Sequence, residues 1–129
     1  MSSEKPVLQK LLLKAGMRAA VLNAPSSYEP VLDRQLPPDV TVSRQLDSSK
    51  YDFIHAFATQ RAELLRDGPA WRQALESNGL LWVSYPKGKA IPTDLNRDVV
   101  RLTVQQVGLD TVSQVAIDDT WSALRLKPI

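Results

Sequence analysis

The chain contains no cysteine and only one histidine, His55, among its 129 residues. Cysteine and histidine are the usual ligands of zinc and iron–sulfur centres, so we expect neither a metal nor a bound cofactor. The absence of cysteine also excludes disulfide bonds and thiol catalysis, which is typical of cytosolic proteins. We therefore expect a cytoplasmic protein whose fold is stable without a metal.

Long apolar runs are missing as well. The run from Leu11 to Leu13 is far shorter than the roughly 20 residues that span a bilayer, and Met1 to Pro6 lacks the pattern of a secretory signal. The net charge is only +2, and lysine and arginine are spread along the chain instead of forming a basic stripe. The sequence thus predicts neither a membrane nor a nucleic-acid partner.

The sequence does contain short apolar runs that alternate with segments of helical periodicity, and residues that favour turns separate them. Extended runs predict strands at residues 17–22, 40–43, 51–57 and 80–84. Periodic segments predict helices at 6–13, 28–34, 58–66, 69–77 and 93–107. The break at 67–69 follows from the dipeptide Gly68-Pro69, and Thr93 and Asp94 are expected to begin the last helix.

The end of the chain has a different pattern. Residues 111–117 and 121–127 are β-prone and are separated only by 118–120, which predicts an antiparallel hairpin. We therefore predict one α/β domain over residues 1–129, a Rossmann-like three-layer sandwich whose mainly parallel sheet ends in that hairpin. Only seven residues link 40–43 to 51–57, so a parallel pairing of the strand at 40–43 stays open.

This order of elements resembles a shortened class I methyltransferase, in which a Gly-x-Gly turn follows the first strand. Here Asn23-Ala24-Pro25 stands at that turn, and Pro25 removes an amide donor. We therefore expect no tight binding of S-adenosylmethionine. The segments 16–25, 81–87, 93–96, 108–109 and 118–121 are also similar to an uncharacterised family of short bacterial proteins, a domain of unknown function, which implies no particular reaction.

Candidate binding residues follow from the rule that open α/β sheets bind ligands beyond the carboxyl ends of their strands. The loops expected there carry polar residues and one cation: Asn23, Ser26, Ser84, Lys87, Thr93 and Asp94. If these loops converge, a lysine and free helix amides would suit a phosphate or a carboxylate. The sequence thus predicts a site for a small anionic ligand.

No nucleophile–base pair is recognisable, and His55 lies within an apolar strand where a structural hydrogen bond is the simpler role than that of a catalytic base. This favours a non-catalytic or regulatory binding module. Two alternatives stay open: a methyltransferase-like enzyme with an atypical cofactor loop, and a protein–protein interaction domain that forms a homodimer through an edge strand.

Overall fold

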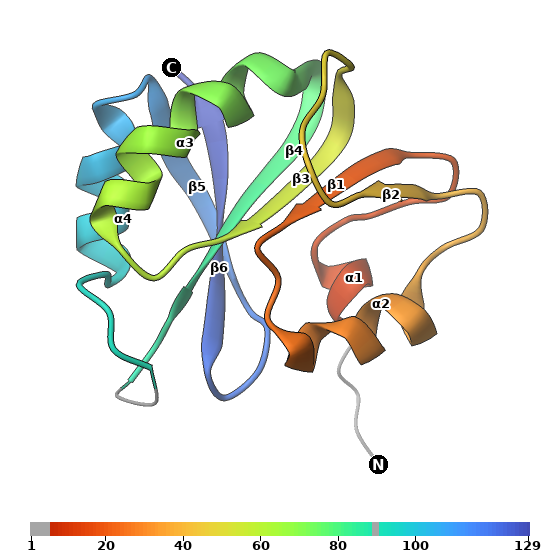
Figure 1. The fold of residues 1–129 in the computed structure, drawn as a ribbon, viewed down its shortest axis with the longest axis horizontal. Helices are drawn as coiled ribbons and strands as arrows, with labels where there is room; N and C mark the ends of the chain where they lie inside the picture. Colours follow the sequence, from red (N-terminus) through yellow and green to blue (C-terminus); the bar gives the residue numbers. More distant parts are fainter. Residues whose placement is uncertain (1–5, 89–90) are drawn as a thin grey trace.

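The computed structural model describes residues 6–88 and 91–129. Its strands form a six-stranded sheet in the order β2-β1-β3-β4-β6-β5 (Figure 1). The pairs β2–β1, β1–β3 and β3–β4 are parallel, whereas β4–β6 and β6–β5 are antiparallel. The strands are β1 (Arg18–Leu22), β2 (Thr41–Ser43), β3 (Tyr51–Phe57), β4 (Leu75–Pro86), β5 (Leu109–Ala116) and β6 (Trp121–Pro128).

Helices cover both faces of the sheet, as Figure 1 shows. Helix α3 (Arg61–Ala74) and helix α4 (Arg97–Gln105) pack on one face, while α1 (Val7–Lys10), the 3-10 helix η1 (Ser26–Tyr28) and α2 (Glu29–Gln35) lie on the other. Two separate clusters of buried apolar side chains fill the space between the layers. The predicted Rossmann-like sandwich with a terminal hairpin is confirmed. None of the described helices is long and apolar enough to cross a bilayer.

The strand predicted at 40–43 is present as β2, and it is parallel. Its partner is β1, with Arg18 opposite Thr41, and β3 pairs with the other edge of β1. The short link between β2 and β3 therefore does not join neighbouring strands. From β1 the chain proceeds to β2 on one side and then to β3 on the other side, so the strand order reverses between β1 and β3. In open α/β sheets a ligand-binding crevice forms at this kind of position.

The N-terminal helix is shorter than predicted. Helix α1 ends at Lys10, and Leu12 adopts a left-handed conformation with φ +70°. This turn places Leu11 and Leu13 in the core and leaves Leu12 exposed, because a continuous helix could not bury both. The indole Nε1 of Trp82 donates to the Leu11 carbonyl at 2.9 Å, which fixes the segment across β4.

The predicted helix break at 67–69 is wrong, because α3 continues through Pro69. Gly68 is buried, and a Cβ there would lie 2.9 Å from Cγ2 of Val107. The glycine therefore permits close packing of α3 on the segment after α4, and it does not end the helix. Burial of Leu64 and Trp71 offsets the backbone hydrogen bond that Pro69 lacks.

Two further boundaries differ from the prediction. Residues 75–79, expected at or after a helix end, already belong to β4, since Leu75 is extended and pairs with Tyr51. Helix α4 begins at Arg97, not at Thr93. Its N-cap is Asn96, whose side-chain oxygen accepts from the Val99 amide at 2.9 Å and so satisfies a backbone donor of the first turn.

Candidate functional site at the carboxyl ends of the strands

The loop after β1 lies at the point where the strand order reverses. Asn23 is exposed and left-handed, with φ +59°, and this conformation turns the chain away from the sheet. Pro25 is extended and precedes η1, whose first residue, Ser26, is exposed. The backbone amides of Ser26 and Ser27 donate to no acceptor within residues 6–88 and 91–129. The loop thus offers two unpaired backbone donors at exposed residues without using a glycine turn.

Beneath this loop, three side chains from separate elements form a buried chain of hydrogen bonds. The hydroxyl of Tyr28 lies 3.2 Å from Nδ1 of His55, and Nε2 of His55 lies 2.6 Å from Oγ of Ser84. Tyr28, His55 and Ser84 are 2%, 0% and 0% exposed. We call this set the buried relay. Because a neutral imidazole has one donor and one acceptor nitrogen, the direction of one bond fixes that of the other.

Burial also sets the charge of the relay. It lowers the pKa of His55 to about 3, and it raises the pKa of the Tyr28 hydroxyl. Both groups are therefore neutral near pH 7. The ring of His55 stacks on Phe57 and meets the edge of Tyr28, so apolar contacts hold the imidazole on both sides. The geometry favours the structural role for His55, and it directs the predicted site residue Ser84 inward.

The loop after β4 attaches to the carboxyl end of β3. The Thr93 hydroxyl donates to the Thr59 carbonyl, and Oδ1 of Asp94 accepts from the Arg61 amide at 2.7 Å. Thr93 and Asp94 thus hold the start of α3. They do not begin α4, as the sequence suggested, because their side chains bond to Thr59 and Arg61 and the N-cap of α4 is Asn96.

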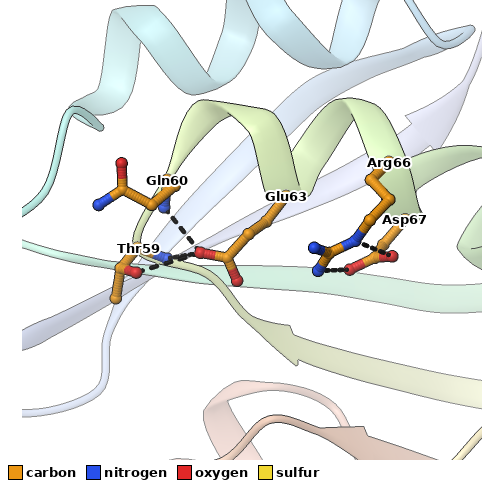
Figure 2. Close-up of polar contacts among 5 residues, drawn as sticks. All are labelled: Thr59, Gln60, Glu63, Arg66 and Asp67. Atoms are coloured by element: carbon orange, nitrogen blue, oxygen red, sulfur yellow. Dashed lines mark hydrogen bonds and ion pairs between the residues drawn. The ribbon is translucent and has the colours of Figure 1, made fainter.

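The start of α3 receives a second carboxylate from its own first turn. Figure 2 shows Glu63 turned back toward Thr59 and Gln60, whose amides donate to Oε1 of Glu63 at 3.1 and 3.0 Å. The same oxygen accepts from the Thr59 hydroxyl. With Asp94, two carboxylates therefore occupy the amino end of α3, where they offset the helix dipole and oppose the approach of an anion.

Lys87 lies apart from these contacts, on the side toward the terminal hairpin. Its side chain is half-buried, and its amide donates to the Thr120 carbonyl at 2.8 Å. The turn that follows β5 is closed by Asp118, which accepts from the Thr120 and Trp121 amides. The hairpin turn thus positions Lys87, the one cationic residue of the predicted site, and the loops that carry Asn23 and Thr93 do not.

An ion pair lies at the carboxyl end of β2. The guanidinium of Arg44 donates both to Oε2 and to Oε1 of Glu29, at 2.8 and 2.6 Å, and this bidentate contact holds the pKa of the Glu29 carboxyl below its usual range. It connects β2 to the first turn of α2. This pair was not predicted from the sequence, and neither were the contacts of Tyr28 and Glu63; among them only Glu63 has a local signal, the capping pattern from Gln60 to Glu63.

The structure therefore distributes the predicted residues over four places. Asn23 and Ser26 lie in the loop after β1, Ser84 belongs to the buried relay, Thr93 and Asp94 join the end of β3, and Lys87 adjoins the hairpin turn. Of five surface hollows in the described part of the chain, one is lined by Asp94 with Arg61, and none by the other predicted residues. That these six residues bind one ligand stays a prediction.

Comparison with known proteins identifies the fold. No family model matches the sequence, and no curated protein matches it. Among solved structures, an S-adenosylmethionine-dependent methyltransferase from Aquifex aeolicus superposes with a TM-score of 0.67 at 14% identity, over 95% of this chain and 88% of that one. The CcbJ methyltransferase from Streptomyces caelestis superposes with a TM-score of 0.62 at 11% identity, over 96% and 94% of the two chains.

A third structure, a complex of DhpI with SAH, superposes with a TM-score of 0.63 at 9% identity, over 95% of this chain and 83% of that one. At such identities the likeness concerns the fold alone. The chain shares the Rossmann-like fold of these structures, as the order of its elements predicted.

Proposed function

We propose that this chain is a methyltransferase-like protein that binds an adenosyl ligand, S-adenosylmethionine or S-adenosylhomocysteine, through an atypical loop at the crevice between β1 and β3. The observation that carries this proposal is the loop of residues 23–27. It lies at the reversal of strand order in a fold shared with methyltransferases, and its Ser26 and Ser27 amides are free to donate.

The loop also explains why we expect weak binding. Asn23 supplies the left-handed turn that a glycine would otherwise make, but its side chain limits how closely a ligand can approach the backbone. Pro25 offers no amide donor. We expect a dissociation constant between about 0.1 and 1 mM, which corresponds to roughly 4 to 5.5 kcal/mol of binding free energy.

The chemistry of methyl transfer is compatible with such a site. Transfer from a sulfonium to an acceptor atom depends chiefly on holding the two in line at close approach, and it does not require a nucleophilic side chain of the protein. The buried relay holds the floor of the loop rigid, since Tyr28 follows Ser26 and Ser27 directly and is anchored through His55 to β4. We assign no catalytic residue.

The second candidate is the small-anion site of a non-catalytic module. The half-buried Lys87 supports it, whereas the carboxylates of Asp94 and Glu63 at the amino end of α3 oppose it. The negative charge of these carboxylates therefore favours an adenosyl ligand over a phosphate. The sulfur atom is a positive sulfonium in S-adenosylmethionine and is neutral in S-adenosylhomocysteine, whereas a phosphate is negative.

A titration followed by ¹⁵N–¹H correlation NMR tests the two candidates side by side. With S-adenosylhomocysteine, we expect saturable shifts at the amides of Ser26, Ser27 and Thr59. With inorganic phosphate, the anion hypothesis requires shifts at Lys87 that Lys87→Ala removes. Shifts at Lys87 alone would replace the adenosyl proposal with the anion site, and no saturable shift from the adenosyl ligand up to about 5 mM would refute the proposal.

A loop variant sharpens the test. Pro25→Ala returns an amide donor at the turn, and we expect it to tighten binding of S-adenosylhomocysteine several-fold. Pro38→Ala is the matched control, because Pro38 is exposed and lies in the loop before β2. Equal affinities for both variants would mean that the missing amide at Pro25 does not account for the weak binding.

A further inference from the structure

The largest of the five described hollows lies at the opposite, amino end of β4. It has a volume of about 620 Å³, within the range of pockets that bind small molecules, and it opens to solvent. Its walls come from the start of β4, from β5 and from the end of β6. They are formed by Leu75, Ser77, Asn78, Gly79, Val112, Arg125, Leu126, Lys127 and Pro128.

An irregularity in β4 creates this hollow. Tyr51 pairs with Leu75, but Phe53 pairs with Leu80, so four residues of β4 stand opposite a single residue of β3. Pairing of β4 with β6 begins only at Leu81 opposite Leu126. The segment 76–79 thus bulges from the ladder, and the ends of β4 and β6 separate.

Gly79 closes this bulge. A Cβ at Gly79 would lie 2.7 Å from Cδ1 and 2.9 Å from Cγ of Leu75, so a larger residue there would require the Leu75 side chain to shift. The glycine therefore lets the chain pass close to Leu75 within the bulge.

The charge of the hollow is of one sign. Its charged lining residues are Arg125 and Lys127, which alternate along β6 and so point to the same face of the sheet. Neither lies within 4.0 Å of a carboxylate in the described part of the chain. Asp110 stands opposite Lys127 in β5, but its carboxylate accepts from the Thr111 amide and from Gln105 of α4, and it does not line the hollow.

The remaining lining divides into a polar and an apolar part. Ser77 and Asn78 add hydrogen-bonding side chains beside the two cations, whereas Leu75, Val112 and Pro128 add apolar walls. An oxyanion would be held by the guanidinium and the ammonium through charge-assisted hydrogen bonds. An apolar body attached to the oxyanion would contact the other walls.

We propose that this hollow is a binding site for a small organic phosphate, with Arg125 and Lys127 holding the phosphate and the apolar walls contacting its organic part. The site is separate from the crevice between β1 and β3, and its existence does not depend on the adenosyl ligand. The phosphate and the organic part contribute separately to the affinity. Each contribution can be measured with a ligand that carries both parts or only one of them.

The experiment titrates the full chain with phenyl phosphate, inorganic phosphate and phenol, and follows the backbone amides of Ser77, Asn78 and Gly79 by NMR. We expect phenyl phosphate to bind at least 5-fold more tightly than inorganic phosphate, and phenol to cause no saturable shift. Equal affinities for the two phosphates would overturn the role of the apolar walls. Saturation by phenol at the same concentrations would overturn the role of the cations.

Variants then locate the site. Lys127→Gln and Arg125→Gln should each weaken phenyl phosphate binding several-fold, and Val112→Asp, at a position 53% exposed, should abolish it by placing a carboxylate in the wall. Lys14→Gln is the matched control, since Lys14 is exposed and lines none of the five hollows. An equal loss in Lys14→Gln and Lys127→Gln would show that the probe senses overall charge, and the site would be rejected.

Discussion

The two ends of β4 use their polar groups in opposite ways. At the carboxyl end, Ser84 bonds to His55 inside the core, and the loop that follows uses Thr93 and Asp94 to hold β3 and α3. At the amino end, Arg125 and Lys127 surround an open hollow and pair with no carboxylate in the described residues. The rule that open α/β sheets bind ligands beyond the carboxyl ends of their strands locates the polar residues at those ends. Whether a polar side chain is available to a ligand depends on its hydrogen-bond and ion-pair partners.

Removing the imidazole of the buried relay should have the largest effect on the carboxyl end. His55→Ala leaves a cavity and takes a partner from both Tyr28 and Ser84, so we expect a loss on the order of 3 kcal/mol in the free energy of unfolding. Urea denaturation measures it. Ser84→Ala removes one bond only and should cost about 1 kcal/mol. A loss below about 1 kcal/mol in His55→Ala would show that the relay contributes little to the fold.

The same histidine should make stability depend on pH. Its pKa is about 3 in the folded chain and near 6.5 when exposed, so below pH 6.5 the unfolded chain binds a proton that the folded chain does not. Stability is therefore retained above pH 6.5 and falls, at a limiting slope of about 1.4 kcal/mol per pH unit, as the pH decreases toward 3. Comparison of urea midpoints at pH 7 and pH 5 measures the loss.

His55→Gln is the control for this titration, because its side chain keeps a donor and an acceptor but does not bind a proton in that range. The difference in stability between pH 7 and pH 5 should be smaller in His55→Gln than in the unchanged chain. Identical differences would assign the pH dependence to carboxylates elsewhere.

A smaller effect is expected from the loop that attaches to α3. Asp94→Ala removes the acceptor of the Arg61 amide and one of two carboxylates at the amino end of the helix, which should cost about 1 kcal/mol. Asp119→Ala, at an exposed position of the hairpin turn, is the matched control and should change stability by less than about 0.5 kcal/mol. Thermal unfolding distinguishes the two variants, and equal shifts would mean that the contact with Arg61 is not a cap.

The sequence predicted those parts of the fold that depend on local pattern. The hairpin of β5 and β6 followed from two β-prone runs with a short polar link, and the strands β1 and β3 followed from apolar runs bounded by turn formers. The continuous α3 could not be predicted, because Gly68 and Pro69 signal a break locally. A glycine is needed at position 68 because Val107 packs closely against it in the folded chain. Val107 lies 39 positions further along the sequence, so this contact has no local signal.

The candidate site shows the same limit. The fold rule placed Asn23, Thr93 and Lys87 at one edge of the sheet, but it did not reveal that Tyr28 meets His55 from 27 residues away, or that His55 meets Ser84 from 29 residues away. The contact between His55 and Ser84 depends on the register of β3 and β4, and the contact between Tyr28 and His55 depends on how η1 packs on the sheet; a single sequence specifies neither. For the same reason the hollow beside Arg125 was not predicted, since it arises from the shift in pairing between β3 and β4.

The smallest expected change in stability is that of Asn23→Gly, and this variant separates the conformational role of the loop from its chemical role. Asn23 has φ +59°, a conformation that asparagine and glycine adopt readily and β-branched residues do not. Asn23→Gly should therefore change the free energy of unfolding by less than about 0.5 kcal/mol, whereas Asn23→Val should cost about 1 to 2 kcal/mol. Because Asn23 is exposed, loss of packing contributes little to either value. If Asn23→Gly is stable and also binds S-adenosylhomocysteine more tightly, the side chain of Asn23 limits the approach of the ligand to the backbone. If Asn23→Gly and the unchanged chain have the same affinity, that side chain does not restrict the crevice, and the missing amide at Pro25 accounts for the weak binding.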